Sequence, residues 1–147
     1  MGRPWSAHIR GQRNETIQMS EHMRTLTAHQ TNECNRAIRV TADDVDPDNG
    51  NASHVYDVAV GTGPDGHQLH HFRLLFQHGP IKEVGTNGIT HEVLIAILID
   101  RLECFQTGKF ANEYNAQALR YLCSARATLL ARTQERLDRN VEGTHQL

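Results

Sequence analysis

The sequence predicts an α+β protein in which a small N-terminal antiparallel β-sheet packs on a C-terminal antiparallel helical hairpin, assembled as a homo-oligomer. Between residues 34 and 78, apolar and polar residues alternate, which is the period of a strand with one buried face. After residue 79, apolar residues recur at helical spacing in two segments separated by Gly108. The first of these segments is apolar nearly all round, so it needs more cover than one hairpin and a small sheet provide. This excess predicts self-association.

The chain divides into three parts. Residues 1–33 form a polar N-terminal extension that is partly helical or disordered, with one thin apolar stripe over 14–28 as the candidate helix. Residues 34–78 form an antiparallel β-meander. Residues 79–147 form a glycine-rich loop and a helical hairpin, which we expect to bind the ligand and to mediate oligomerisation.

Composition excludes several classes of function. The 147 residues carry a formal charge of −2, so no general basic field attracts nucleic acid or acidic lipid. The longest apolar run, residues 93–99, is too short to span a bilayer. Three cysteines without CxxC spacing predict reduced, buried thiols in a cytosolic protein. We therefore expect no nucleic-acid or membrane partner.

Three strands are expected in the meander. Residues 37–41 alternate, and a turn of Asp, Pro, Asn and Gly follows at 43–51. Residues 54–60 alternate again, and a second turn follows at 61–66. Residues 67–77 give the third strand. Such a sheet needs cover on its apolar face, and the helices after Gly79 are expected to supply it.

Two clusters of metal-ligand side chains occur in this half, namely Asp44, Asp46 and Asp48, and His67, His70 and His71. The aspartates resemble a calcium loop, but the glycine comes one place late and Val55 stands where a glutamate would close the site. The histidines have no carboxylate or thiol at ligand spacing. We expect a solvated turn and a strand, with no metal site and no cofactor.

The hairpin begins after a flexible loop. Gly85 and Gly88 allow positive φ there, and Asn87 tolerates it. The first helix is expected to start at the N-cap Thr90 and to run past Phe105.

The second helix follows a short turn. Gly108 is placed as the C′ residue and Asn112 as the next N-cap, with the helix running to about Arg139. Its inward stripe is expected to contain Ala118, Leu122, Ala125 and Leu129.

Two arginines continue that stripe. Arg132 and Arg136 lie three and seven residues after Leu129, and in an antiparallel hairpin they return to the neighbourhood of Lys82 and the 85–88 loop. Backbone N–H groups, a helix N-terminus and three cations together suit a phosphate or pyrophosphate. No Walker motif, paired carboxylates or nucleophile with an evident base accompanies them, so recognition is favoured over turnover.

The hairpin also resembles a known family. The resemblance rests on three motifs, FQHGPIKEVGTNGIT, FQTGKFANEYNAQAL and RTQERLDRNVEGT, which are spread over about residues 74–145. These resemble the helical-hairpin domain of phage anti-defence sponges, which comprise the Thoeris anti-defence sponges and the anti-CBASS cyclic-oligonucleotide sponges. The resemblance implies a non-catalytic protein of the infected bacterial cytoplasm that sequesters immune second messengers. The implied ligands are glycocyclic ADP-ribose isomers and cyclic di- or trinucleotides.

The resemblance also implies residue roles. Phe105 and Asn115 match the pair that recognises base and ribose, Arg132 and Arg136 match the anion-binding arginines, and Lys82 matches the lysine of the IKxxG segment. A dimer is implied as the building unit of a larger ring or hexamer.

Helix geometry limits how these residues cooperate. Asn115 and Arg132 are seventeen positions apart, which is about 25 Å along a helix. One small ligand reaches both only if they come from two antiparallel protomers; otherwise there are two sites. Three alternatives stay open: an enzyme that cleaves nucleotides with His91 or Glu92, a nucleic-acid-binding regulator, and a purely structural oligomer.

Overall fold

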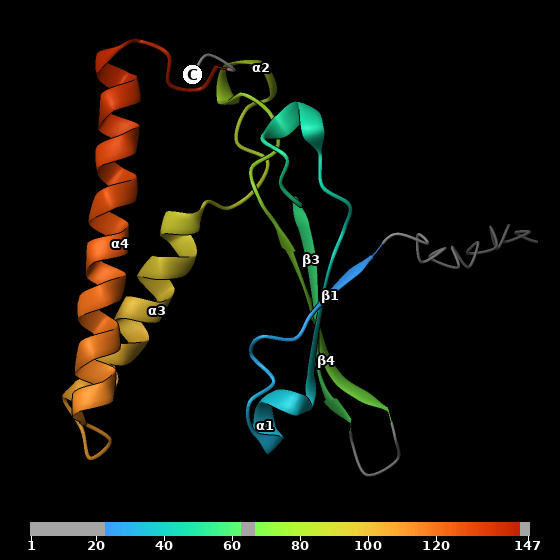
Figure 1. Ribbon diagram of the computed structural model, residues 1–147, viewed down its shortest axis with the longest axis vertical. Coiled ribbons are helices and arrows are strands. Elements are labelled where there is room, and N and C mark those ends of the chain that lie inside the picture. Colours follow the sequence, from blue (N-terminus) through green and yellow to red (C-terminus); the bar gives the residue numbers. More distant parts are fainter. Residues whose placement is uncertain (1–22, 63–66, 145–147) are drawn as a thin grey trace, which may run out of the picture.

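The computed structural model describes residues 23–62 and 67–144, and its class is α+β, as predicted (Figure 1). The strands are β1 (Arg24–Leu26), β2 (Ile38–Ala42), β3 (Val55–Thr62) and β4 (Gln68–Leu75). The helices are α1 (Glu33–Arg36), the 3-10 turn η1 (Pro47–Asn49), α2 (Ile81–Val84), α3 (His91–Gln106) and α4 (Glu113–Asp138).

The sheet is an antiparallel meander in chain order, β1-β2-β3-β4. The registers pair Leu26 with Val40, Val40 with Val58, and Val58 with Phe72, so these four side chains share one face. The three predicted strands are confirmed as β2, β3 and β4. Their alternation identified them because one face of the sheet is mainly apolar.

The edge strand β1 corrects the expected helix over 14–28. Arg24–Leu26 is a strand paired with β2, and residues 14–22 of the expected helix lie outside the described residues. A three-residue strand carries too short a pattern to be read from the sequence, because its conformation depends on the neighbouring strand.

Both helices of the hairpin begin after the residues that were predicted to cap them. Thr90 precedes α3, and the side chain of Asn112 accepts a hydrogen bond of 2.9 Å from the Asn115 amide at the start of α4. Gly108 is the C′ residue, as predicted, because it follows the C-cap Thr107, but it does not have the positive φ that is common at this position. The Thr107 hydroxyl donates to the Cys104 carbonyl.

The predicted inward stripe of α4 is half correct. Leu122 and Leu129 are half-buried, whereas Ala118 and Ala125 are exposed. The half-buried line instead runs through residues 119, 122, 126, 129, 133 and 136. This line repeats every seven residues in steps of three and four, and it passes through residues 119 and 126 where the prediction used their neighbours Ala118 and Ala125.

The expected packing of the sheet on the hairpin is wrong. Figure 1 shows the sheet and the hairpin diverging from the connection that contains α2, and within the described residues no strand contacts α3 or α4. Backbone hydrogen bonds fix this connection: the Gln77 amide donates to the Ile89 carbonyl, and the Ile89 amide donates to the Leu75 carbonyl. Phe72 on the apolar face is therefore 53% exposed.

A single chain buries little apolar surface. Among the described residues, the buried hydrophobic side chains are Ala42 and Ile99. The prediction of buried thiols is wrong for Cys34 and Cys104, which are exposed, while Cys123 is half-buried, and all three are free. None of the described helices has the length and the apolar composition needed to cross a membrane.

Candidate functional site

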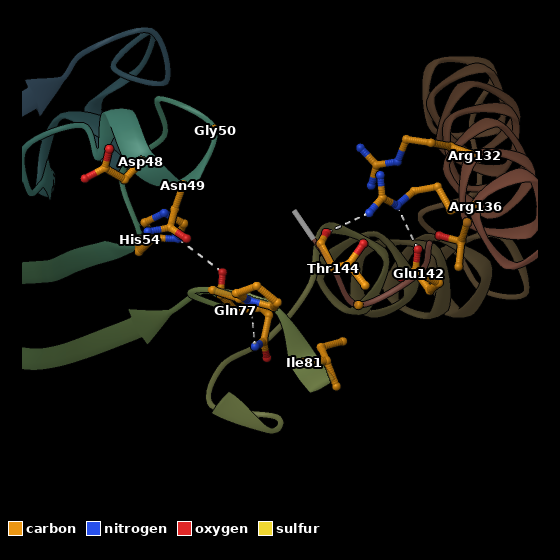
Figure 2. Close-up of a pocket in the computed structure, with 14 residues that line it drawn as sticks. Asp48, Asn49, Gly50, His54, Gln77, Ile81, Arg132, Arg136, Glu142 and Thr144 are labelled. Atoms are coloured by element: carbon orange, nitrogen blue, oxygen red, sulfur yellow. Dashed lines mark hydrogen bonds and ion pairs between the residues drawn. The ribbon is translucent and has the colours of Figure 1, made fainter. Parts of the chain in front are cut away.

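One cavity lies between the C-terminal half of α4 and the segments at one end of the sheet. Its volume is about 920 Å³. Figure 2 shows Arg132 and Arg136 projecting from α4 on one side, with Asn49, His54 and Gln77 across from them. The wall is completed by Asp48, Gly50, Gly79, Pro80, Ile81, Thr133, Glu142, Gly143 and Thr144. Both arginines therefore lie in the wall of one cavity, as their shared helix face allows.

Arg132 is the more available of the two arginines. Its side chain is 59% exposed, and its ion pair with Glu92 is long, at 3.9 Å. A guanidinium offers five N–H donors in a planar fork that suits phosphate oxygens. Most of that donor capacity faces the cavity, so Arg132 can accept an anion without first losing a strong partner.

Arg136 is held by the chain that follows α4. Its Nε donates to Glu142 at 2.9 Å, and its Nη2 donates to the carbonyl oxygens of Thr144 at 3.0 Å and Val141 at 3.2 Å. The side chain is 24% exposed. Arg136 therefore clamps residues 141–144, three of which line the cavity, a role that its helical spacing did not reveal.

Lys82 lies beside this cavity and not in its wall. Its amide donates to the Gly143 carbonyl at 3.3 Å, and its side chain lines a smaller cavity of about 290 Å³ with Leu137 and Asn140. Ile81, Glu142 and Gly143 separate the two cavities, since they line both. The structure thus brings Lys82 close to the arginines through the 141–144 turn.

Gly85 and Asn87 organise the loop itself. Gly85 has a φ of +72°, as expected, and its carbonyl accepts from the Gln77 side chain at 2.9 Å. The Asn87 side chain pairs with both backbone groups of His78, at 2.9 and 2.8 Å. Neither residue lines the two cavities described above. Their polar groups are used inside the loop.

Gly88 is needed for close approach and not for positive φ, which corrects its expected role. A Cβ atom there would overlap the backbone of Phe76. This is where the connection crosses itself, because Phe76 and Ile89 form a parallel bridge. The crossing sets where α3 begins relative to the end of the sheet.

A second cavity lies at the tip of the hairpin. It has a volume of about 510 Å³ and is lined by Phe105 and Asn115, which the family resemblance had paired. Phe110 stands edge-on to Phe105, with 6.0 Å between ring centroids, and Lys109 completes the wall. Arg101 lies over the Phe105 ring at 4.8 Å. The sequence analysis missed Phe110 and Lys109, whose nearness follows from the turn between α3 and α4.

The side-chain amide of Asn115 uses only part of its hydrogen-bonding capacity within the chain. Its Nδ2 donates to the Phe110 carbonyl at 3.3 Å, which leaves its Oδ1 and its second N–H for another partner. An aromatic wall, an amide and an ammonium group suit a planar heterocycle with attached hydroxyls.

The two cavities are at opposite ends of one helix. Asn115 and Arg132 both belong to α4, which runs without a break from Glu113 to Asp138. One chain therefore presents an aromatic cavity and an arginine cavity separated by about 25 Å.

A smaller cavity of about 280 Å³ adjoins the arginine cavity. It is lined by His91 and Glu92 from the start of α3, together with Arg132 and His54. The His91 ring packs 5.5 Å from that of Phe76. These are the two side chains that the sequence offered as bases.

Comparison with known proteins places the hairpin in a family. The model of the family described as Acb2/Tad1, hairpin domain, matches residues 68–134. The chain carries an Acb2/Tad1 hairpin domain. This domain begins with β4 and includes Phe105, Asn115 and Arg132, whereas Arg136 lies two residues beyond it. The resemblance predicted from the motifs is confirmed.

A relative extends the same match. The chain is 48% identical over 71 residues to a protein named Thoeris anti-defense 1 from Bacillus phage SBSphiJ7. The aligned part is 48% of this chain and 50% of that relative, so the chain spans about half the length of the relative it matches.

Proposed function

We propose that this protein is a phage anti-defence protein that binds and sequesters nucleotide second messengers of bacterial immunity without cleaving them. The observation that carries the proposal is the pair of cavities at the two ends of the Acb2/Tad1 hairpin domain. One offers guanidinium groups and the other an aromatic wall. The name of the phage relative supports a role against the Thoeris defence.

The arginine cavity is the proposed phosphate site. Arg132 would bind phosphate oxygens through its exposed fork, while Arg136 adds positive charge and holds the 141–144 turn in place. Lys82, next to that turn, would add a longer-range attraction for the anion. Gly85 and Asn87 would support this site by holding the loop.

The hairpin tip is the proposed base and ribose site. The Phe105 ring offers a face for stacking, and the free amide groups of Asn115 can bond to ring nitrogens or ribose hydroxyls. Together the two cavities favour glycocyclic ADP-ribose isomers and cyclic di- or trinucleotides as the ligands, in the cytoplasm of the infected bacterium. Capture there would keep the messenger from activating the host effector.

We further propose that the protein is a homo-oligomer built from dimers, up to a ring or hexamer. The outer side of α3 carries Val93, Ile97 and Leu98, which are 43%, 58% and 48% exposed. A second hairpin packed antiparallel would cover them and would bring the tip of one chain beside the arginines of the other. One ligand could then span both cavities.

This assembly is tested by sedimentation of the wild type and of Ile97→Glu. A charge in the proposed interface should release monomers, whereas Ala127→Glu on the exposed side of α4 should not. Tight nucleotide binding by a wild-type monomer would exclude the shared site.

The function is tested by capture and release. The protein is incubated with glycocyclic ADP-ribose and a panel of cyclic di- and trinucleotides, filtered, and then heated. Sequestration requires nanomolar affinity, about −12 kcal/mol, so stoichiometric depletion is expected. Recovery of the unaltered nucleotide on heating would establish a sponge, and absence of depletion would refute the proposal.

The same assay tests an enzymatic alternative. His91 and Glu92 share a cavity with Arg132, and Glu92 is 3.9 Å from its guanidinium. If these groups act as bases, the panel would be converted to new products. Such conversion by the wild type would make the protein a nucleotide-cleaving enzyme. Its loss in Glu92→Gln would assign Glu92 as the base.

A further inference from the structure

Three side chains that can bind a metal converge from three separate segments. Asp46 lies in the turn after β2, His54 just before β3, and His78 after β4. One ligand atom of each lies within 4.8 Å of the others. They are eight and twenty-four positions apart in sequence, and no motif spacing connects them. Only the pairing of β3 with β4 brings them together.

His54 supplies the decisive observation. Its Nδ1 is 3.1 Å from the Gln77 carbonyl oxygen, and because a carbonyl only accepts, the ring proton is on Nδ1. The Nε2 atom then carries a lone pair, and it is buried without a hydrogen-bond partner. A bond from the second ring nitrogen to a backbone carbonyl is the usual support of a metal-binding histidine.

Asp46 is prepared as an anionic ligand. Asn49 donates to its Oδ2 at 2.8 Å, and the Asp48 amide donates to its Oδ1 at 2.9 Å. These two bonds hold the carboxylate in one orientation.

His78 completes the set. Its Nε2 is 2.7 Å from Asp46 Oδ2, and its ring stacks on that of His54 with centroids 4.4 Å apart and planes 23° apart. Stacked rings direct their edges the same way, so both imidazoles can face one ion. Two atoms bound at about 2.1 Å in a tetrahedral site lie about 3.4 Å apart, so binding would draw the most distant pair closer by up to about 1.4 Å.

We propose that Asp46, His54 and His78 form a binding site for one transition-metal ion of the Zn²⁺ type. Two imidazoles and one carboxylate are borderline ligands that suit Zn²⁺ and leave a fourth position for water. The ion would replace the proton between His78 Nε2 and Asp46 Oδ2, so His78 would bind through Nε2 with its remaining proton on Nδ1. The ion would join the β2–β3 turn to the segment that leads into the hairpin, at the sheet side of the arginine cavity that His54 lines.

A second carboxylate–histidine pair, in the sheet, differs from the proposed site because an arginine also binds its carboxylate. Asp57 is 3.0 Å from His71, but Arg73 also binds its carboxylate, at 3.0 Å. The guanidinium occupies the position that a metal would need and repels it. His71→Ala is therefore a matched control, since it removes a half-exposed histidine from an aspartate outside the proposed site.

The test uses the untagged full chain, stripped with a chelator and titrated with ZnCl₂ in a calorimeter. One Zn²⁺ per chain and a higher melting temperature with Zn²⁺ are expected. His78→Ala and Asp46→Asn should weaken binding by about 100-fold or more, and His71→Ala should leave it unchanged. Since His78 is 52% exposed, its variant should fold, and circular dichroism of the metal-free protein checks this.

Two results would overturn the proposal. One is failure of the wild type to bind Zn²⁺ stoichiometrically, and the other is equal binding by wild type, His78→Ala and Asp46→Asn. Nitrogen-15 shifts of His54 give an independent readout, because Nε2 coordination moves that resonance while Nδ1 stays protonated. No nucleotide is present in these measurements, so their outcome is separate from that of the capture assay.

Discussion

The two cavity arginines should respond differently to truncation. Arg136→Ala removes a 2.9 Å bond to Glu142 and two bonds to the carbonyls of Val141 and Thr144. Arg132→Ala removes only the 3.9 Å ion pair with Glu92, and the Arg132 side chain is 59% exposed. We therefore expect Arg136→Ala to reduce stability and nucleotide affinity together, and Arg132→Ala to reduce affinity alone.

The magnitudes follow from these contacts. A hydrogen bond to a charged group contributes about 1.5–3 kcal/mol, but here water can replace the lost partners because the clamp is only half-buried. The net loss for Arg136→Ala should be about 2 kcal/mol, which lowers the melting temperature of a chain this size by about 4–8 °C. Arg132→Ala should change stability by less than about 0.5 kcal/mol. Its lost phosphate contact should weaken nucleotide binding by about 10- to 150-fold.

The assay pairs thermal unfolding of the ligand-free protein with nucleotide titration. Arg120→Ala is the control, because Arg120 is on the same helix, is 62% exposed and pairs with the exposed Glu113. It should leave both quantities unchanged. Equal melting temperatures for Arg136→Ala and wild type would refute the clamp. Equal affinity of Arg132→Ala and wild type would refute the phosphate role of Arg132.

Three other changes probe the scaffold. Gly88→Ala should destabilise the connection and raise its proteolysis, because the new Cβ would overlap the Phe76 backbone, whereas Gly50→Ala, with open space, should strain only its left-handed turn. Ile99→Ala should cost about 2–4 kcal/mol in urea unfolding, since Ile99 is 4% exposed; a cost below about 1 kcal/mol would show that α3 does not depend on this contact. Finally, the hydrogen bond from Arg73 holds the pKa of Asp57 below its ordinary value. The folded state thus loses its proton more readily than the unfolded state, so the pair stabilises the protein above about pH 4, and this contribution disappears as pH falls further. The stability gap between wild type and Asp57→Asn should shrink in acid, and a gap that is constant with pH would contradict this origin.

The local sequence was sufficient to predict the main strands and helices and the family of the hairpin domain. Alternation predicted three strands, Thr90 and Asn112 marked the helix starts, and the motifs identified the hairpin domain. These signals depend on residues within one turn or one strand of each other, which is why they can be read without a structure. The placing of Arg132 and Arg136 on one helix face has the same local origin, whereas the pairing of Phe105 with Asn115 came from the family resemblance.

The tertiary structure decided what depends on distant contacts. The crossing at Gly88 sends the hairpin away from the sheet, although the apolar face of the sheet had suggested that the helices would cover it. The clamp made by Arg136 requires the chain to turn back after α4, and the Asp46, His54 and His78 cluster requires the register of β3 and β4. No spacing within a segment specifies such encounters, because they depend on the relative placement of segments that only the folded chain fixes.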